Sequence, residues 1–260
     1  MIGILGGMGP AATVDFLAKL VRLTPAERDQ DHLPLVVVSD PRVPDRVAPI
    51  MESRGPSPLE ALRRGIRTLE QAGAACIAIP CHTAHYWYDG MVESARVPIL
   101  HVVDAVLADL ARRGGVPDEV GLLATAATLK AGFYQQRLEA VGCACAVPAA
   151  DVMASCVLPA IALVKRSRAV EAAPLLAQAI GHLKDRGART IVLACTELPI
   201  ALAAAPDPPA CLDATEALAR ACLEWHRSQG EARSPIRPVR PAGRRRDAGE
   251  RLRAGDGRND

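Results

Sequence analysis

The chain has 260 residues, a formal net charge of +2 and 50% hydrophobic residues, enough for two modest domains or one large one with a sizeable core. No window approaches the uninterrupted apolar run of about 20 residues that a membrane span needs, so we expect no membrane partner. Eight cysteines, together with an N-terminus that lacks a basic leader region, indicate a cytoplasmic protein whose thiols stay free.

Short apolar segments alternate with helical patterns through the first hundred residues. A helix is predicted to begin at Pro10, because proline is favoured in a first turn, and a later helix places Leu62, Ile66 and Leu69 on one face. Strands buried on both faces and separated by amphipathic helices are typical of a parallel α/β sheet. The predicted strands are residues 2–5, 33–39, 76–80 and 97–102.

The second half of the chain repeats the first. Residues 120–134 ("VGLLATAATLKAGFY") share the pattern of residues 2–16 ("IGILGGMGPAATVDF"), with an offset of 118 positions. Residues 190–200 ("TIVLACTELPI") match residues 76–86 ("CIAIPCHTAHY"), and the cysteines in the two segments are 114 positions apart. The repeat predicts an α/β protein of two similar lobes, each a parallel sheet flanked by helices, with the active site in the cleft between them.

The end of the chain differs from the rest in composition. Residues 228–260 contain nine Arg against five Asp or Glu, a balance of +4, which leaves −2 for the rest of the chain. This Arg-, Pro- and Gly-rich segment cannot bury enough apolar surface to offset its ordering entropy, so we expect a disordered tail. Acidic residues are interspersed among its arginines, so we do not expect nucleic-acid binding. We expect an N-terminal lobe of residues 1–102 plus 212–227 and a C-terminal lobe of residues 103–211.

Two cysteines stand at equivalent strand ends. Cys81 and Cys195 each have a threonine beside them, Thr83 or Thr196, and each precedes a predicted helix. Ligands of open parallel sheets bind beyond the carboxyl ends of the strands, so facing lobes would place both thiols in one cleft. N–H groups at a helix start stabilise anions, which predicts lowered thiol pKa values and a docking place for a carboxylate. A thiol on each face of one carbon can remove a proton from one side and return one from the other.

Six features of residues 1 to about 226 are informative in combination: "GGMGPAAT" (6–13), "PDR" (44–46), "PCHTAHYWY" (80–88), "LLATAATLKAGFYQ" (122–135), Lys165 and "ACTELP" (194–199). Together they resemble the aspartate/glutamate racemase family, and most closely its aspartate racemase branch. The resemblance implies a homodimeric enzyme without a cofactor that racemises a small amino acid, aspartate before glutamate. It also implies that Cys81 and Cys195 are the catalytic acid and base.

The resemblance further implies which residues bind the substrate. Arg46 and Lys165 correspond to the basic pair that receives the acidic substrate. The other implied substrate-binding residues come from the same motifs and are Met8, Gly9, His82, Thr83, Thr128, Thr196 and Glu197.

The chain departs from the family pattern at four positions. His82 stands where the family usually has asparagine, and Asp40 in "SDP" also replaces an asparagine; Ala127 and Ala194 replace glycines. A histidine can donate to a carboxylate through either ring nitrogen. Asp40 would repel an anionic substrate unless it pairs with a cation such as Arg46.

Three alternatives stay open. "GMGPAA" (7–12) followed by Asp40 fits the dinucleotide-binding fingerprint of an NAD(P)-dependent oxidoreductase, although that leaves both cysteines unexplained. Cys81, His82 and His85 could hold a metal ion, although Cys195 would then have no role, and we expect no metal. The substitutions at His82 and Asp40 would also suit a non-catalytic amino-acid-binding relative, which only an activity assay distinguishes from an enzyme.

Overall fold

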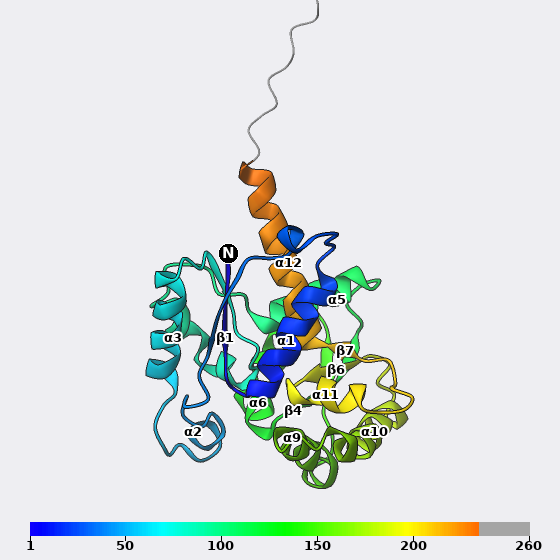
Figure 1. Ribbon diagram of the computed structural model, residues 1–260. Helices are drawn as coiled ribbons and strands as arrows, with labels where there is room; N and C mark the ends of the chain where they lie inside the picture. The colour runs from blue at the N-terminus through cyan, green and yellow to red at the C-terminus, as the bar shows by residue number, and fades with distance from the viewer. Residues whose placement is uncertain (234–260) are drawn as a thin grey trace, which may run out of the picture.

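The computed structural model describes residues 1–233, which form two parallel β-sheets with helices between and around them (Figure 1). The first sheet has the strand order β2-β1-β3 and consists of β1 (Ile2–Gly6), β2 (Leu35–Ser39) and β3 (Cys76–Ala78). The second has the order β5-β4-β6-β7 and consists of β4 (Glu119–Ala124), β5 (Ala144–Ala146), β6 (Ile191–Ala194) and β7 (Leu212–Asp213). The predicted α/β architecture with two similar lobes is confirmed.

The two sheets share one topology. In each, the first strand in the chain lies between the second and the third, and all the pairs are parallel, so β4, β5 and β6 correspond to β1, β2 and β3. In the second sheet β7 pairs with β6. Its counterpart in the first sheet is a single bridge between Ile77 and Ile99, so the strand predicted over residues 97–102 is reduced to this bridge.

The helices divide into an inner and two outer groups. The inner helices share one core with both sheets and are α1 (Pro10–Leu23), α5 (Val102–Arg112), α7 (Phe133–Glu139) and α12 (Ala214–Arg233). The first sheet carries α3 (Leu59–Gln71) and α4 (Tyr88–Val92) on its outer side. A third core, around the second sheet, contains α9 (Leu158–Lys165), α10 (Ala169–Asp185) and α11 (Glu197–Ala203).

Shorter helical segments connect these elements, and several of them reach the cleft. They are η1 (Asp29–Asp31), α2 (Val47–Glu52), η2 (Thr83–Trp87), α6 (Ala126–Ala131), α8 (Ala150–Val152) and η3 (Met153–Val157). Pro10 begins α1 and the apolar face of α3 is buried, as the sequence predicts. Within residues 1–233, no helix combines the length and apolar character that crossing a bilayer requires.

The lobes exchange their last helices. α5 follows the first sheet in the chain but packs against α7, whereas α12 follows the second sheet and packs against α1 and α5. The sequence analysis assigns residues 212–213 to the first lobe. They instead form β7, which lies in the second sheet. α12 continues to Arg233, which places the predicted tail boundary at residue 227 inside a helix. The prediction of a disordered tail otherwise falls on residues 234–260, outside the described part of the chain.

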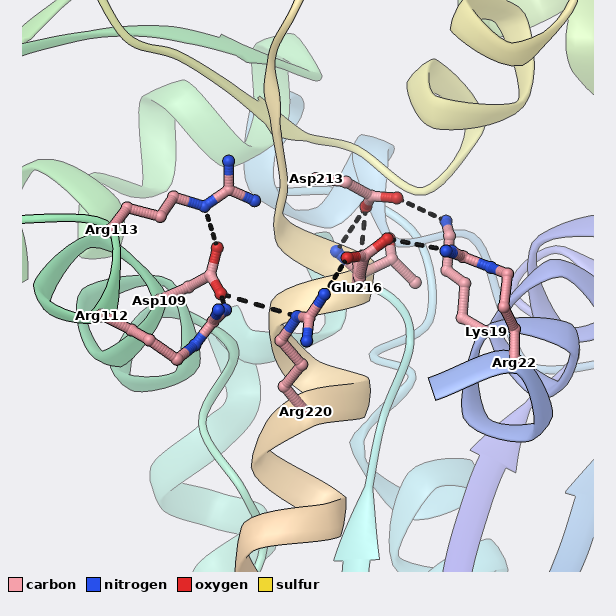
Figure 2. A network of polar contacts seen from close by, with 9 residues as sticks. Lys19, Arg22, Asp109, Arg112, Arg113, Asp213, Glu216 and Arg220 are labelled. Atoms are coloured by element: carbon pink, nitrogen blue, oxygen red, sulfur yellow. Dashed lines mark hydrogen bonds and ion pairs between the residues drawn. The ribbon is translucent and has the colours of Figure 1, made fainter. Parts of the chain in front are cut away.

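A network of charged side chains connects these inner helices (Figure 2). The buried Lys19 of α1 pairs with Asp213, whose Oδ2 lies 2.6 Å from its Nζ, and Asp213 also accepts N–H groups in the first turn of α12. Glu216 of α12 pairs with Arg22 at 2.9 Å and with Arg220 at 2.7 Å. These contacts hold α12, which follows the second sheet, against α1, which follows the first strand. They therefore link the two halves of the chain.

Candidate active site

The ends of β3 and β6 bring the two predicted thiols to one cavity. Cys81 follows β3 and Cys195 follows β6, and their side chains are only 6% and 4% exposed. The cavity is small, with a volume of about 30 Å³. Its lining consists of Met8, Asp45, Arg46, Val47, Cys81, His82, Thr83, Thr125, Lys165, Cys195, Thr196 and Glu197.

Most of the predicted site residues are in this lining, and two are not. A Cβ at Gly9 would lie 3.7 Å from Oε1 of Glu197, so the backbone of Gly9 closes the cavity beside that carboxylate. Thr128 has no exposed surface and lies behind Thr83, to whose hydroxyl it hydrogen-bonds at 3.1 Å. We therefore expect Gly9 and Thr128 to shape the site through Glu197 and Thr83.

Cys195 is paired with a carboxylate. Its thiol donates to Oε2 of Glu197 at 3.1 Å, and the hydroxyl of Thr196 donates to the same oxygen at 3.0 Å. Glu197 is 5% exposed and begins α11, with two residues between it and the end of β6. The carboxylate is therefore oriented by two donors from its own turn, next to the sulfur atom.

The backbone of Cys81 is held by a histidine. Val102 N–H donates to Nε2 of His85 at 3.3 Å, so that nitrogen is the acceptor and Nδ1 carries the hydrogen. Nδ1 then donates to the carbonyl oxygen of Cys81 at 3.0 Å. Burial lowers the pKa of His85 to about 4, so this ring is neutral near pH 7. His85 thus ties the cysteine turn to the start of α5 rather than facing the substrate.

Burial raises the pKa of both thiols. At Cys81 the positive charge of Arg46 opposes this effect, whereas at Cys195 the negative charge of Glu197 adds to it, and the pKa of Cys195 lies well above its usual range. The prediction of lowered pKa values is wrong. Removal of the thiolates from water outweighs the local N–H groups that the sequence pattern provides.

Two cations face the cavity. Arg46 precedes α2 and donates through Nη1 to the carbonyl oxygens of Val43 and Pro44, at 3.3 and 3.0 Å. Lys165 is the last residue of α9 and forms no ion pair with any residue of the described range 1–233. Asp45 also reaches the cavity, but its Oδ2 accepts the N–H groups of the first turn of α2. Arg46 and Lys165 thus bring two positive charges to the cavity, beside the carboxylates of Asp45 and Glu197.

The ring of His82 is engaged away from the cavity. Its Nδ1 lies 2.8 Å from the hydroxyl of Tyr134 on α7, and the two rings stack with centroids 5.9 Å apart. Burial lowers the pKa of His82 to about 3, so the ring is neutral at physiological pH. A cationic contact from His82 to a substrate carboxylate is therefore not available, and Nδ1 already has a partner.

A cluster of three hydroxyls crosses the cleft. Thr83 of the first lobe lies 3.2 Å from Thr125 and 3.1 Å from Thr128 of the second lobe, oxygen to oxygen. Thr125 caps α6 by accepting the N–H of Thr128 at 3.1 Å. Thr125 is not among the predicted site residues, although its position at the end of β4, the counterpart of β1, is a usable signal.

Asp40 lies outside this cavity. It pairs with Arg42, with Oδ1 at 2.8 Å from Nε, and both residues line a separate hollow beside β2 and α3. Asp40 does not pair with Arg46, the cation that the sequence analysis named as a possible partner. The backbone of Asp40 instead crowds Gly7, whose φ is +90° and where a Cβ would lie 2.4 Å from Asp40 N.

The glycine loop and the histidines bear on the alternatives. A Cβ at Gly6 would lie 2.4 Å from Thr13 and one at Gly7 would lie 2.4 Å from Asp40, so close packing within the protein explains these two glycines, whereas a Cβ at Gly9 would make only an ordinary contact with Glu197. The Cys81, His82 and His85 grouping does not form a metal site, since both histidine rings are hydrogen-bonded within the protein. In the described part of the chain, no three His, Cys, Asp or Glu side chains are grouped to hold a metal ion.

Comparison with known proteins identifies the family. The profile of the Asp/Glu/Hydantoin racemase family matches residues 5–222. The chain belongs to this family. An aspartate racemase from Picrophilus torridus is 34% identical, with a TM-score of 0.75, over 86% of this chain and 93% of that one. The broad-specificity amino-acid racemase RacX of Bacillus subtilis is 29% identical over 204 residues, which are 76% of this chain and 86% of that protein.

Family members of lower identity share the fold. The aspartate racemase homologue PH1733 from Pyrococcus horikoshii OT3 is 22% identical, with a TM-score of 0.63, over 86% of this chain and 97% of that one. At this identity the likeness concerns the fold alone. Family membership makes the protein an isomerase of the racemase type and removes the basis for an NAD(P)-dependent oxidoreductase, because the glycine-rich loop belongs to the racemase fold.

Proposed function

We propose that this protein is an amino-acid racemase without a cofactor that acts on aspartate first and glutamate next. The observation that carries the proposal is that two thiols and two cations line one cavity between the lobes. Arg46 and Lys165 supply two positive charges for a substrate with two carboxylates. A neutral side chain would leave one of them unpaired, and each charge-assisted hydrogen bond contributes roughly 1.5–3 kcal/mol.

The chemistry that we propose uses the thiols in opposite roles. One thiolate removes the α-proton: its S–H bond forms, the C–H bond breaks, and the electron pair moves into the α-carboxylate. The opposite thiol then gives its proton to the other face, so a new C–H bond forms and that sulfur becomes the thiolate. The total charge of the pair is unchanged, and no oxidant or cofactor enters the balance.

The surroundings of the thiols support an assignment of starting roles. Cys195 donates to Glu197, which favours its thiol form, and the nearby negative charge disfavours its thiolate. At Cys81 the charge of Arg46 favours the thiolate against the effect of burial. We therefore propose that Cys81 acts as the base and Cys195 as the acid in the first half of the cycle.

The remaining lining suits recognition of an amino acid. We propose that Thr83 donates to a substrate carboxylate, that Thr196 does so when its hydroxyl exchanges Glu197 for the substrate, and that Met8, Gly9 and Glu197 bound the space around the α-carbon. The location of His82 beside Cys81 supports a contact of its backbone with the substrate, since its ring is bonded to Tyr134. From the family resemblance we also expect a homodimer in the cytoplasm.

The test is chiral chromatography of the purified protein with a panel of amino acids in both enantiomeric forms, without added cofactor. We expect the fastest interconversion with aspartate. Faster turnover of alanine or lysine than of aspartate would reject the substrate class, and a substrate range like the one named for RacX would be seen directly. No turnover of any amino acid would favour a non-catalytic binding relative.

The two-base step is tested separately by isotope uptake. In deuterated water, early turnover of one enantiomer should place deuterium in the product while the remaining substrate keeps its protium. Equal early labelling of both pools would mean that one base serves both faces, and the roles proposed for Cys81 and Cys195 would be wrong.

A further inference from the structure

Two histidines that follow Cys81 connect its turn to different parts of the fold. His85 holds the Cys81 carbonyl and bonds to Val102, so this contact stays within the first lobe and the start of α5. His82 bonds to Tyr134 of α7, which belongs to the second lobe. The position of Cys81 relative to the second lobe therefore depends on the contacts that His82 and its neighbour make across the cleft.

Two sets of hydrogen bonds join the lobes here, one between threonine hydroxyls and one between His82 and Tyr134. They differ in how directly a ligand in the cavity could reach them. Thr83 and Thr125 line the cavity, so their mutual bond at 3.2 Å competes with any ligand that accepts from either hydroxyl. Tyr134 has no exposed surface and does not line the cavity. A ligand in the cavity therefore does not compete directly for the hydroxyl of Tyr134, although His82 itself lines the cavity.

Tyr134 is also close to the opposite thiol. Burial raises the pKa of its phenol well above the usual range, and the negative charges of Cys195 and Asp213 add to this effect. The phenol is thus neutral and lies within electrostatic reach of Cys195. The hydrogen bond of His82, the residue after Cys81, thus reaches a side chain that lies near enough to Cys195 for their charges to interact.

We infer that the hydrogen bond between His82 and Tyr134 is a positioning contact that sets the distance of Cys81 from the second lobe, and hence from Cys195. This inference rests on the proposed two-thiol racemisation. Proton transfer between a sulfur atom and a carbon requires close approach, and a misplacement of about 1 Å can cost roughly 100-fold in rate. The histidine that departs from the family pattern thereby has a role other than contact with the substrate.

The main test replaces Tyr134 with phenylalanine, which removes only the hydroxyl from a buried ring. We expect kcat for aspartate to fall at least about tenfold in both directions, with KM changed less than about threefold. The matched control is Tyr88→Phe, which removes a hydroxyl that donates to Ile99 within the first lobe at 2.9 Å. We expect the control to lower stability without lowering kcat.

Substitutions of His82 separate positioning from packing. The amide of His82→Asn places a polar atom near the position of Nδ1, whereas His82→Leu does not. We expect His82→Asn to keep at least about fivefold more of kcat than His82→Leu, and Tyr134→Phe to cause no further loss in the His82→Leu background. A kcat for Tyr134→Phe within twofold of the parent, or a change in KM alone, would overturn the inference.

A second readout does not depend on racemisation. The alkylation rate of Cys81 by iodoacetamide, followed by peptide mass spectrometry, reports how well its turn is held. We expect at least about threefold faster alkylation in Tyr134→Phe and an unchanged rate in Tyr88→Phe. If the parent protein racemises no amino acid, the proposed function fails while this rate still decides the positioning role, and an unchanged rate in Tyr134→Phe overturns it.

Discussion

The thiol of Cys195 donates to Oε2 of Glu197 across 3.1 Å, in a turn that also directs the hydroxyl of Thr196 to the same oxygen. Cys81, at the equivalent point of the first lobe, has its carbonyl held by His85, and its sulfur lies in the field of Arg46. The internal repeat thus produces two thiols at equivalent positions with different electrostatic surroundings. That difference is what a pair with one thiol and one thiolate requires.

Loss of either sulfur should stop racemisation. We expect Cys81→Ser and Cys195→Ser each to lower kcat by roughly 10²–10⁴, because a serine hydroxyl is a far weaker base and acid–base groups contribute about this much. Chiral chromatography with each enantiomer of aspartate measures the loss. The control is Cys156→Ser, whose sulfur is buried beside Gln178 outside the cavity, and activity lost equally in this control would contradict the assignment.

Removal of the lysine cation should weaken binding of the acidic substrate. In Lys165→Met we expect KM for aspartate to rise roughly tenfold or more, with a smaller change in kcat, because a charge-assisted contact of about 1.5–3 kcal/mol is lost. The control is Lys184→Met on the exposed side of α10. It makes the same change of charge at a site away from the cavity. An unchanged KM in Lys165→Met would place the side chain outside the substrate's reach.

The location of the two thiols was predictable because the repeat can be recognised from short segments of the sequence. Strand, small-residue turn and cysteine recur in the same order in each half, and parallel sheets present their strand ends at one edge. The positions of Arg46 and Lys165 at the cavity could not be predicted from such local patterns. Arg46 follows a loop and Lys165 ends a helix, so only resemblance to the family connected them with the cleft.

Other features depend on contacts that no local pattern contains. His82 and Tyr134 are 52 positions apart, and their bond arises from the packing of α7 against the end of β3. The raised thiol pKa values follow from burial depth, which is a property of the assembled lobes rather than of a turn. The partner of Asp40, by contrast, is local: Arg42 is only two positions away, and Asp40 pairs with it rather than with Arg46.

The raised thiol pKa values predict the pH dependence of the reaction. The reactive form has one thiolate, and a raised pKa keeps both sulfurs protonated to higher pH, so kcat/KM for aspartate should increase from pH 6 to 9. Glu197→Gln removes a negative charge that raises the pKa of both thiols, including that of the proposed base Cys81, and should move this rising limb to lower pH. A kcat/KM that stays flat over this range in the parent protein would contradict the assignment of thiols as the titrating groups.

The buried histidines should make the fold sensitive to acid. Burial lowers the pKa of His82 to about 3, of His85 to about 4 and of His101 to about 2. In the unfolded chain these groups have pKa values near 6.5, so between about pH 6.5 and 4 the unfolded state binds more protons and stability falls as the pH falls. Above about pH 6.5 the three rings are neutral in both the folded and the unfolded state, so the folded protein loses no stability through them.

His101 allows this to be measured at a single site. Its Nδ1 accepts the N–H of Val103 at 3.1 Å and caps α5, and an asparagine can cap the helix in the same way without taking up a proton. Between pH 6 and 4.5, we expect the slope of unfolding free energy against pH in His101→Asn to be smaller by at most about 1.4 kcal/mol per pH unit, the value for one proton. Urea unfolding at several pH values gives the slope, and the value at pH 7.5 serves as the reference for any direct effect on packing. An identical slope in the parent and in His101→Asn would show that His101 is not a buried neutral group in the folded protein.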